Sequence, residues 1–186
     1  MNICSIYTTF RAWHHDEVEP TRAQLRAVFI ELDRRIDELN RERRREGGFP
    51  LSKAEIQLLG QMSLLANQRV SALLSLAQTA DLDALLKMEH LVKEVLKELL
   101  SKRGLLYDED SYLIWIPDGA RFEAVFNLKN VLVTAIDPES AHVSKAVKAP
   151  AKNKQLIREA IVSGEFPRLV ERIEKAGGDL EFFAED

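Results

Sequence analysis

The sequence predicts an α+β fold, with an N-terminal bundle of long helices followed by a small antiparallel sheet and two or three C-terminal helices. Apolar residues recur every three or four positions between residues 25 and 100, which is the helical spacing. Between residues 112 and 136 they follow the period of two that is typical of strands. Helices therefore precede strands, which favours segregated α+β over a βαβ repeat. We predict a helical bundle over 1–104 and an α+β domain over 105–186, which can pack as one unit.

The first predicted helix begins at Thr21, which with Gln24 has the spacing of a capping box. It ends before the pair Gly47–Gly48. Its apolar seam packs either inside the chain, which we favour, or against a second copy, so that a homo-oligomer remains an alternative. Before this helix, β-branched and aromatic residues over 2–10 predict a short strand. The seam runs in steps of four, three, four and three through Leu25, Phe29, Leu32, Ile36 and Leu39.

The segment 56–80 carries one charged residue, Arg69, and is apolar on two sides. We predict that it forms the central, buried helix of the bundle. Asp81 then caps a third helix that ends at Gly104.

The second half contains three predicted strands, followed by short helices. The turn Pro117-Asp118-Gly119 joins the first two strands, because proline and glycine suit its backbone angles. Asp137 and Pro138 begin a helix that reaches Val147, and 148–153 is linker-like. The predicted strands are 112–116, 121–126 and 131–136, and the last elements are helices over 153–163 and 167–176 and a strand over 180–183.

Composition excludes several classes of protein. The 186 residues include 26 Lys and Arg against 30 Asp and Glu, a net charge of −4 that is ordinary for a globular protein. The single cysteine, Cys4, excludes an intrachain disulfide and a Cys-rich zinc site. The sequence has no secretory signal and no apolar run of about 18 residues. We expect a cytoplasmic protein that does not bind membranes.

The residues that carry chemistry are few. His14, His15 and Asp16 are weak metal-ligand candidates, because adjacent side chains seldom share one metal ion. Ser140 and His142 stand near Asp137, but the Gly-x-Ser-x-Gly turn of a nucleophile is missing, and helix capping by Asp137 explains the segment. Glycine-rich phosphate loops are missing too. We therefore predict no catalytic residue, no metal site and no cofactor.

Two basic segments are candidates for binding phosphate or an acidic partner. The first, 41–45, ends the first long helix, where arginine also complements the helix dipole. The second, 140–158, contains five cations and no acid, whereas the whole chain is acidic. Together with the aromatic residue of the first strand, the binding candidates are Arg41, Arg43, Arg44, Arg45, Lys145, Lys148, Lys152, Lys154, Arg158 and Trp115.

Three classes of function remain open. The first is a non-enzymatic protein-interaction module, such as an accessory subunit of a bacterial assembly or an inhibitor or immunity-type protein, which buries a helical or sheet surface on a protein partner. The second is a nucleic-acid-associated accessory protein that uses segments 41–45 and 145–158. The third is an enzyme with an unrecognised site, for which His14, His15 and Asp16 are the candidates.

Overall fold

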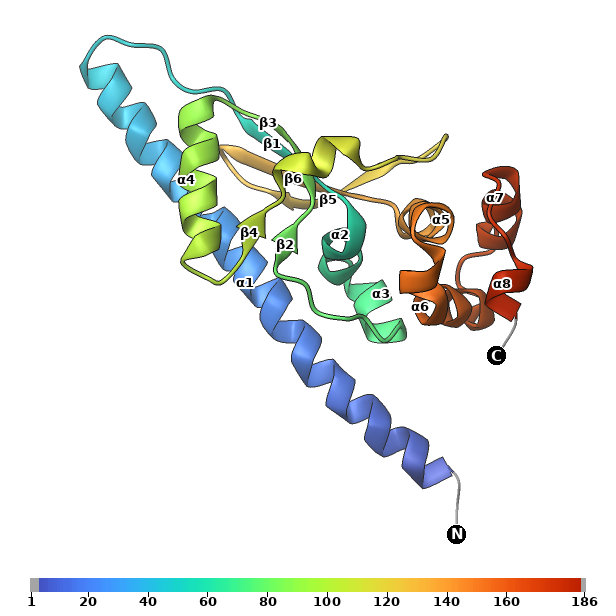
Figure 1. Ribbon diagram of the computed structural model, residues 1–186. Helices are drawn as coiled ribbons and strands as arrows, with labels where there is room; N and C mark the ends of the chain where they lie inside the picture. The colour runs from blue at the N-terminus through green and yellow to red at the C-terminus, as the bar shows by residue number, and fades with distance from the viewer. Residues whose placement is uncertain (1–3, 185–186) are drawn as a thin grey trace.

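The computed structural model describes residues 4–184, with side chains from Arg22 onward. Over this range, helices surround a small β-sheet, and the chain is a mixed helix-and-sheet protein, as the sequence predicts (Figure 1). The elements in chain order are α1 (Cys4–Arg45), β1 (Ala54–Leu58), α2 (Gly60–Ala66), α3 (Gln68–Leu73), β2 (Asp81–Leu82), β3 (Ala84–Lys87), α4 (His90–Ser101), β4 (Leu106–Tyr107), the 3₁₀-helix η1 (Glu109–Leu113), β5 (Phe122–Asn127), β6 (Val131–Ile136), α5 (Pro138–Lys148), α6 (Pro150–Ser163), α7 (Leu169–Lys175) and α8 (Glu181–Ala184).

The main sheet has the strand order β3-β1-β6-β5. β1 is parallel to β6, whereas the β1–β3 and β5–β6 pairs are antiparallel. The sheet is therefore mixed, and the predicted antiparallel meander is confirmed only for β5 and β6. Two strands come from each side of the predicted boundary at residue 104, so both halves of the chain build one sheet. A second, two-stranded ladder joins β2 to β4 in parallel.

Helix α1 confirms the predicted apolar seam. Leu25, Phe29, Leu32 and Ile36 are almost completely buried, and α1 packs inside the chain against α4 and the sheet. The helix already begins at Cys4, so the strand predicted over 2–10 is wrong for the part that the structure describes; residues 2 and 3 lie outside it. Figure 1 shows the N-terminal half of α1 projecting beyond the sheet and the other helices.

The prediction of one central helix over 56–80 is wrong. The segment instead contains β1 and the short helices α2 and α3. A strand next to a parallel neighbour is covered on both faces, and such strands are almost continuously apolar. The scarcity of charge in 56–80 thus reflects burial and not helical structure. Gly60, with φ of +54°, makes the sharp bend between β1 and α2.

Two further predictions fail for local reasons. The third helix begins at His90, because residues 81–87 form β2 and β3. The strand predicted over 112–116 is the end of η1 and an irregular connection, because local hydrogen bonds favour a turn there. The Asp108 carboxylate accepts a hydrogen bond from the Asp110 backbone (2.9 Å), and the Ser111 hydroxyl donates one to the Asp108 carbonyl (2.7 Å).

The C-terminal helices agree better with the sequence. Asp137 caps α5, whose first residue is Pro138, and Gly164 ends α6 in the left-handed conformation. The predicted linker 148–153 is wrong, because Ala149 is the single non-helical residue between α5 and α6. The strand predicted over 180–183 is the short helix α8. No helix of the described chain combines the length and apolar character that a membrane crossing requires.

Candidate functional site

Two aspartates lie beside the carboxyl end of β1. Asp81 begins β2 and Asp83 follows it, and side chains two residues apart in an extended segment point to the same side. The Leu59 backbone donates a hydrogen bond to the Asp83 carbonyl (2.8 Å), which fixes this segment against the end of β1. A Cβ atom at Gly60 would lie 2.1 Å from Asp83 Oδ2, so the carboxylate rests against the backbone at the beginning of α2.

Two lysines complete this grouping, which we name the Asp83 cluster: Asp81, Asp83, Asp108, Lys145 and Lys152. Lys145 comes from α5 and Lys152 from α6, on either side of the one-residue junction at Ala149. Both lysines act electrostatically on the Asp83 carboxylate. Among the described side chains, however, neither forms an ion pair with an aspartate of the cluster. The hydrogen-bond partner of the Lys145 ammonium is Asn153 Oδ1, at 3.4 Å.

The cluster perturbs the titration of its own members. Burial, together with the neighbouring charges of Asp108 and Asp81, raises the pKa of Asp83 to about 6, although Lys145 and Lys152 act in the opposite direction. Burial lowers the pKa of Lys145 to about 8, which Asp83 opposes and Lys152 reinforces. Close to neutral pH both groups are charged, and the partial burial of each charge is unfavourable to folding. Perturbed pKa values cluster at functional sites and also occur in structural charge networks, which makes these residues candidates for a site.

The arrangement limits what could be bound. Within the described residues, no group of three or more His, Cys, Asp or Glu side chains could hold a metal ion. Two carboxylates are nevertheless enough for Mg²⁺ when phosphate oxygens of a ligand and water complete the coordination. Lysine ammonium groups bind phosphate as point charges. The Asp83 cluster thus offers ligands for a cation and for the anion that would accompany it.

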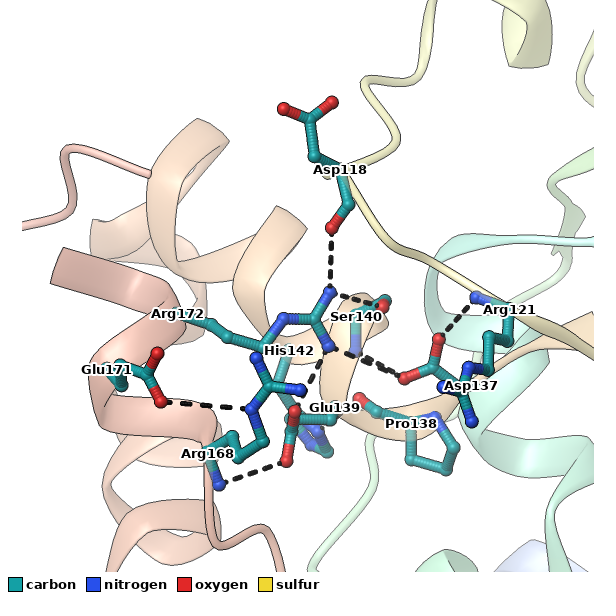
Figure 2. A network of polar contacts seen from close by, with 10 residues as sticks. All are labelled: Asp118, Arg121, Asp137, Pro138, Glu139, Ser140, His142, Arg168, Glu171 and Arg172. Atoms are coloured by element: carbon teal, nitrogen blue, oxygen red, sulfur yellow. Dashed lines mark hydrogen bonds and ion pairs between the residues drawn. The ribbon is translucent and has the colours of Figure 1, made fainter. Parts of the chain in front are cut away.

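A second polar grouping centres on Arg172 of α7, whose side chain is only 14% exposed (Figure 2). Its Nη1 group contacts Glu139 Oε1 at 3.1 Å and Asp137 Oδ1 at 3.8 Å. Its Nη2 group donates to Ser140 Oγ (2.8 Å) and to the Asp118 carbonyl (3.3 Å). Arg172 therefore ties α7 to the beginning of α5 and to the turn before β5. We name these contacts the Arg172 network.

A cavity of about 510 Å³ adjoins the Arg172 network. Several of its charged groups are paired with one another, since Arg69 forms an ion pair with Glu165 and Arg172 is paired with Asp137 and Glu139. Because Arg172 is paired and partly buried, we assign the Arg172 network a structural role. The lining includes Asn67, Arg121, Glu123, Phe166 and Arg168.

Ser140 and His142 do not form a nucleophile and base pair. The Ser140 hydroxyl accepts from Arg172, and its backbone N–H donates to the Asp137 carboxylate (2.9 Å), which is the capping contact predicted from the sequence. His142 is fully buried, its Nδ1–H donates to the Pro138 carbonyl (2.7 Å), and its ring lies 4.7 Å from the Phe166 ring. Burial lowers the pKa of His142 to about 4.

The structure separates the basic residues of the segment 145–158. Lys145 and Lys152 belong to the Asp83 cluster, whereas the Lys148 and Lys154 ammonium groups lie over aromatic rings, 5.0 Å from the Trp115 ring centre and 4.9 Å from that of Phe182. Arg158 lines an apolar groove between α6 and α8. The basic residues of this segment therefore have different neighbours, although Lys148 and Lys152 are both exposed.

The first basic segment is also partly paired. Arg41 forms an ion pair with Asp37, and Arg43 forms one with Glu89, while Arg44 and Arg45 are exposed at the end of α1. The side chains of the metal-ligand candidates His14, His15 and Asp16 lie outside the described residues.

Lys145 and Lys152 are among the binding residues predicted from the sequence, whereas Asp81 and Asp83 are not. A usable signal was present, because two aspartates at an interval of two stand in the otherwise apolar stretch 80–86. The segment was assigned to a helix, where an interval of two places side chains on different faces. Comparisons of the chain with protein-family models, curated proteins and solved structures found no match.

Proposed function

We propose that the chain binds a phosphate-bearing ligand together with a divalent cation at the Asp83 cluster, with a magnesium–nucleoside triphosphate as the class of ligand to test first. One observation carries this proposal. Asp81, Lys145 and Lys152 all act electrostatically on the half-buried Asp83 carboxylate, and no ion pair joins the aspartates to the lysines in the described part of the chain. Opposite charges that do not neutralise each other are available to a ligand that itself carries both signs.

The charges explain why the cation and the phosphate would bind together. A cation alone would be attracted by the two carboxylates but repelled by both lysines. A phosphate alone would be attracted by the lysines but repelled by the carboxylates. A magnesium complex of a polyphosphate presents the cation to Asp81 and Asp83 and oxygen atoms to Lys145 and Lys152. Mg²⁺ in proteins is commonly held by one or two carboxylates plus substrate phosphates.

Isothermal titration calorimetry tests the proposal directly. The wild-type protein is titrated with MgATP, with ATP in EDTA and with Mg²⁺ alone. We expect binding of MgATP and binding at least tenfold weaker for each component alone. Equal affinity for ATP in EDTA would contradict the role of the carboxylates.

Substitutions then locate the site. Asp81→Asn and Lys145→Met are expected to weaken MgATP binding at least tenfold, because each removes a charge that faces the ligand. Asp118→Asn and Lys175→Met are matched controls outside the cluster, and both should bind like the wild type. Unchanged affinity in the Asp81 and Lys145 variants would place the ligand elsewhere.

A protein-interaction module is the second candidate function, favoured by an exposed apolar pair on η1. Tyr112 and Leu113 are 69% and 67% exposed and adjacent. The test is capture of a stoichiometric partner from the native host by the wild-type chain, repeated with a Tyr112→Ser/Leu113→Ser variant. Loss of the partner in this variant, but not in a Phe49→Ser control, would support the interaction. If both variants still capture the partner, η1 is not the surface that binds it.

A further inference from the structure

We infer that Trp115 is a specificity-determining residue that stacks on the base of the nucleotide held at the Asp83 cluster. This inference rests on the proposed function. It adds that the ligand is recognised through its base as well as through its phosphates.

The segment that carries Trp115 is anchored at the cluster at its first end. The Ser111 hydroxyl accepts a hydrogen bond from the Ala84 backbone N–H (3.0 Å), and Ala84 directly follows Asp83. The Asp108 N–H donates to the Leu82 carbonyl (3.2 Å), and Leu82 lies between Asp81 and Asp83 in the sequence. The connection from Asp108 to Ser111 therefore runs beside the backbone that carries both aspartates.

The other end of the segment is fixed to α5, next to the cluster's first lysine. The Ser144 hydroxyl donates to the Trp115 carbonyl (2.7 Å), and Lys145 follows Ser144 in the helix. The Lys148 ammonium lies 5.0 Å from the centre of the Trp115 ring. Lys145 and Lys148 are three residues apart on one helix face, where side chains are neighbours about 5–6 Å apart at Cβ. The indole ring thus contacts a lysine that lies about one helical turn from Lys145, the lysine that acts electrostatically on Asp83.

Trp115 is also available for contact, because its side chain is only partly buried. One face of its ring is contacted by the Lys148 ammonium, and the residue also packs against the hydrophobic core. A nucleotide base could take the place of the Lys148 ammonium, which would then be free to contact a phosphate oxygen. Stacking of a base on an aromatic side chain tolerates every base and strengthens binding by roughly 5- to 150-fold.

Calorimetry with two ligands separates base recognition from phosphate recognition. The wild type, Trp115→Ala, Trp115→Phe and Tyr112→Ala are each titrated with MgATP and with magnesium tripolyphosphate. We expect Trp115→Ala to weaken MgATP at least fivefold and to leave tripolyphosphate binding unchanged, which also shows that the variant is folded. Trp115→Phe should recover most of the affinity. Tyr112→Ala, which removes an exposed aromatic ring from the same segment, should bind both ligands like the wild type.

The remaining outcomes overturn the inference in different ways. Equal weakening of both ligands in Trp115→Ala would assign Trp115 a structural role, and unchanged affinity for both would exclude stacking. Either result leaves the proposed phosphate site intact. If the wild type binds neither ligand, the proposed function fails, and the inference fails with it.

Discussion

Asp83 and Lys145 influence each other's charge without forming an ion pair in the described structure. If the cluster only stabilised the fold, we would expect Lys145 to form an ion pair with the Asp83 carboxylate, because unpaired buried charges cost folding free energy. The missing ion pair lowers the free energy of unfolding of the ligand-free protein. The cluster can therefore be tested by stability measurements without any ligand.

The first prediction concerns Asp83→Asn, which we expect to stabilise the ligand-free protein near pH 7.5 while weakening MgATP binding at least tenfold. The folded state raises the pKa of Asp83 to about 6. The wild-type carboxylate is therefore increasingly unfavourable to folding as the pH rises from 4 to 6. Below about pH 3 the carboxyl group is mostly protonated in both states, so the difference in melting temperature between variant and wild type should disappear there. A variant that is less stable at pH 7.5 than at pH 4, relative to wild type, would reverse the sign and refute the argument.

Gly60→Ala is expected to destabilise the fold and to disrupt the Asp83 cluster. The new Cβ would lie 2.1 Å from Asp83 Oδ2, and the backbone has φ of +54°, which costs a non-glycine residue about 1–2 kcal/mol. Gly119→Ala is the matched control, because Gly119 also has positive φ but its Cβ would meet open space. Both variants should lose stability in urea denaturation, but only Gly60→Ala should lose MgATP affinity. Normal binding by a folded Gly60→Ala protein would contradict the close approach.

His142 should make the protein less stable in mild acid. Its folded-state pKa is lowered from 6.5 to about 4 by burial, so the unfolded chain binds a proton between these values while the folded chain does not. Stability from this group is fully present above pH 6.5 and is lost as the pH falls to 4, by roughly 3 kcal/mol. Denaturation measured from pH 7 to pH 4 for wild type and His142→Phe should show a shallower decline in the variant. Parallel curves would show that His142 does not contribute.

Arg172→Met is expected to cost about 3 kcal/mol, because it leaves the partly buried carboxylates of Asp137 and Glu139 without their counter-charge. The loss should appear as faster hydrogen exchange in α7 and as a lower midpoint of urea denaturation. Arg168→Met is the control, since that side chain is 67% exposed and exposed pairs contribute little. At temperatures where the variant is folded, MgATP affinity should be unchanged. A loss of affinity would connect the Arg172 network to the ligand.

The elements that the sequence predicted well are those whose pattern has one explanation. The seam from Leu25 to Ile36 and the cap at Asp137 depend on local spacing, and both are confirmed. The prediction of a helix over 56–80 was wrong because uniform apolar character fits a buried strand as well as a buried helix. That choice is decided by pairing between β1 and β6, which local sequence does not contain.

The aspartates of the candidate site could not be recognised because a helix was predicted where the chain forms strands. With Asp81 interpreted as a helix cap, the sequence predicts no site residue at Asp81 or Asp83. Lys145 and Lys152 were selected for their charge alone, since their meeting with Asp83 is a property of the tertiary structure. The cation–π contacts of Lys148 with Trp115 and of Lys154 with Phe182 also depend on the tertiary structure and could not be predicted from the local sequence.

The strand order of the sheet also affects how the chain folds during its synthesis. Ala54 pairs with Val131, so β1 leaves the ribosome long before its parallel neighbour is synthesised. Until then β1 has only β3 beside it, and its other edge is open. Closing so long a loop is entropically costly and slow. The newly made chain therefore passes through a stage in which an apolar strand edge is unprotected, and that stage is where aggregation competes with folding.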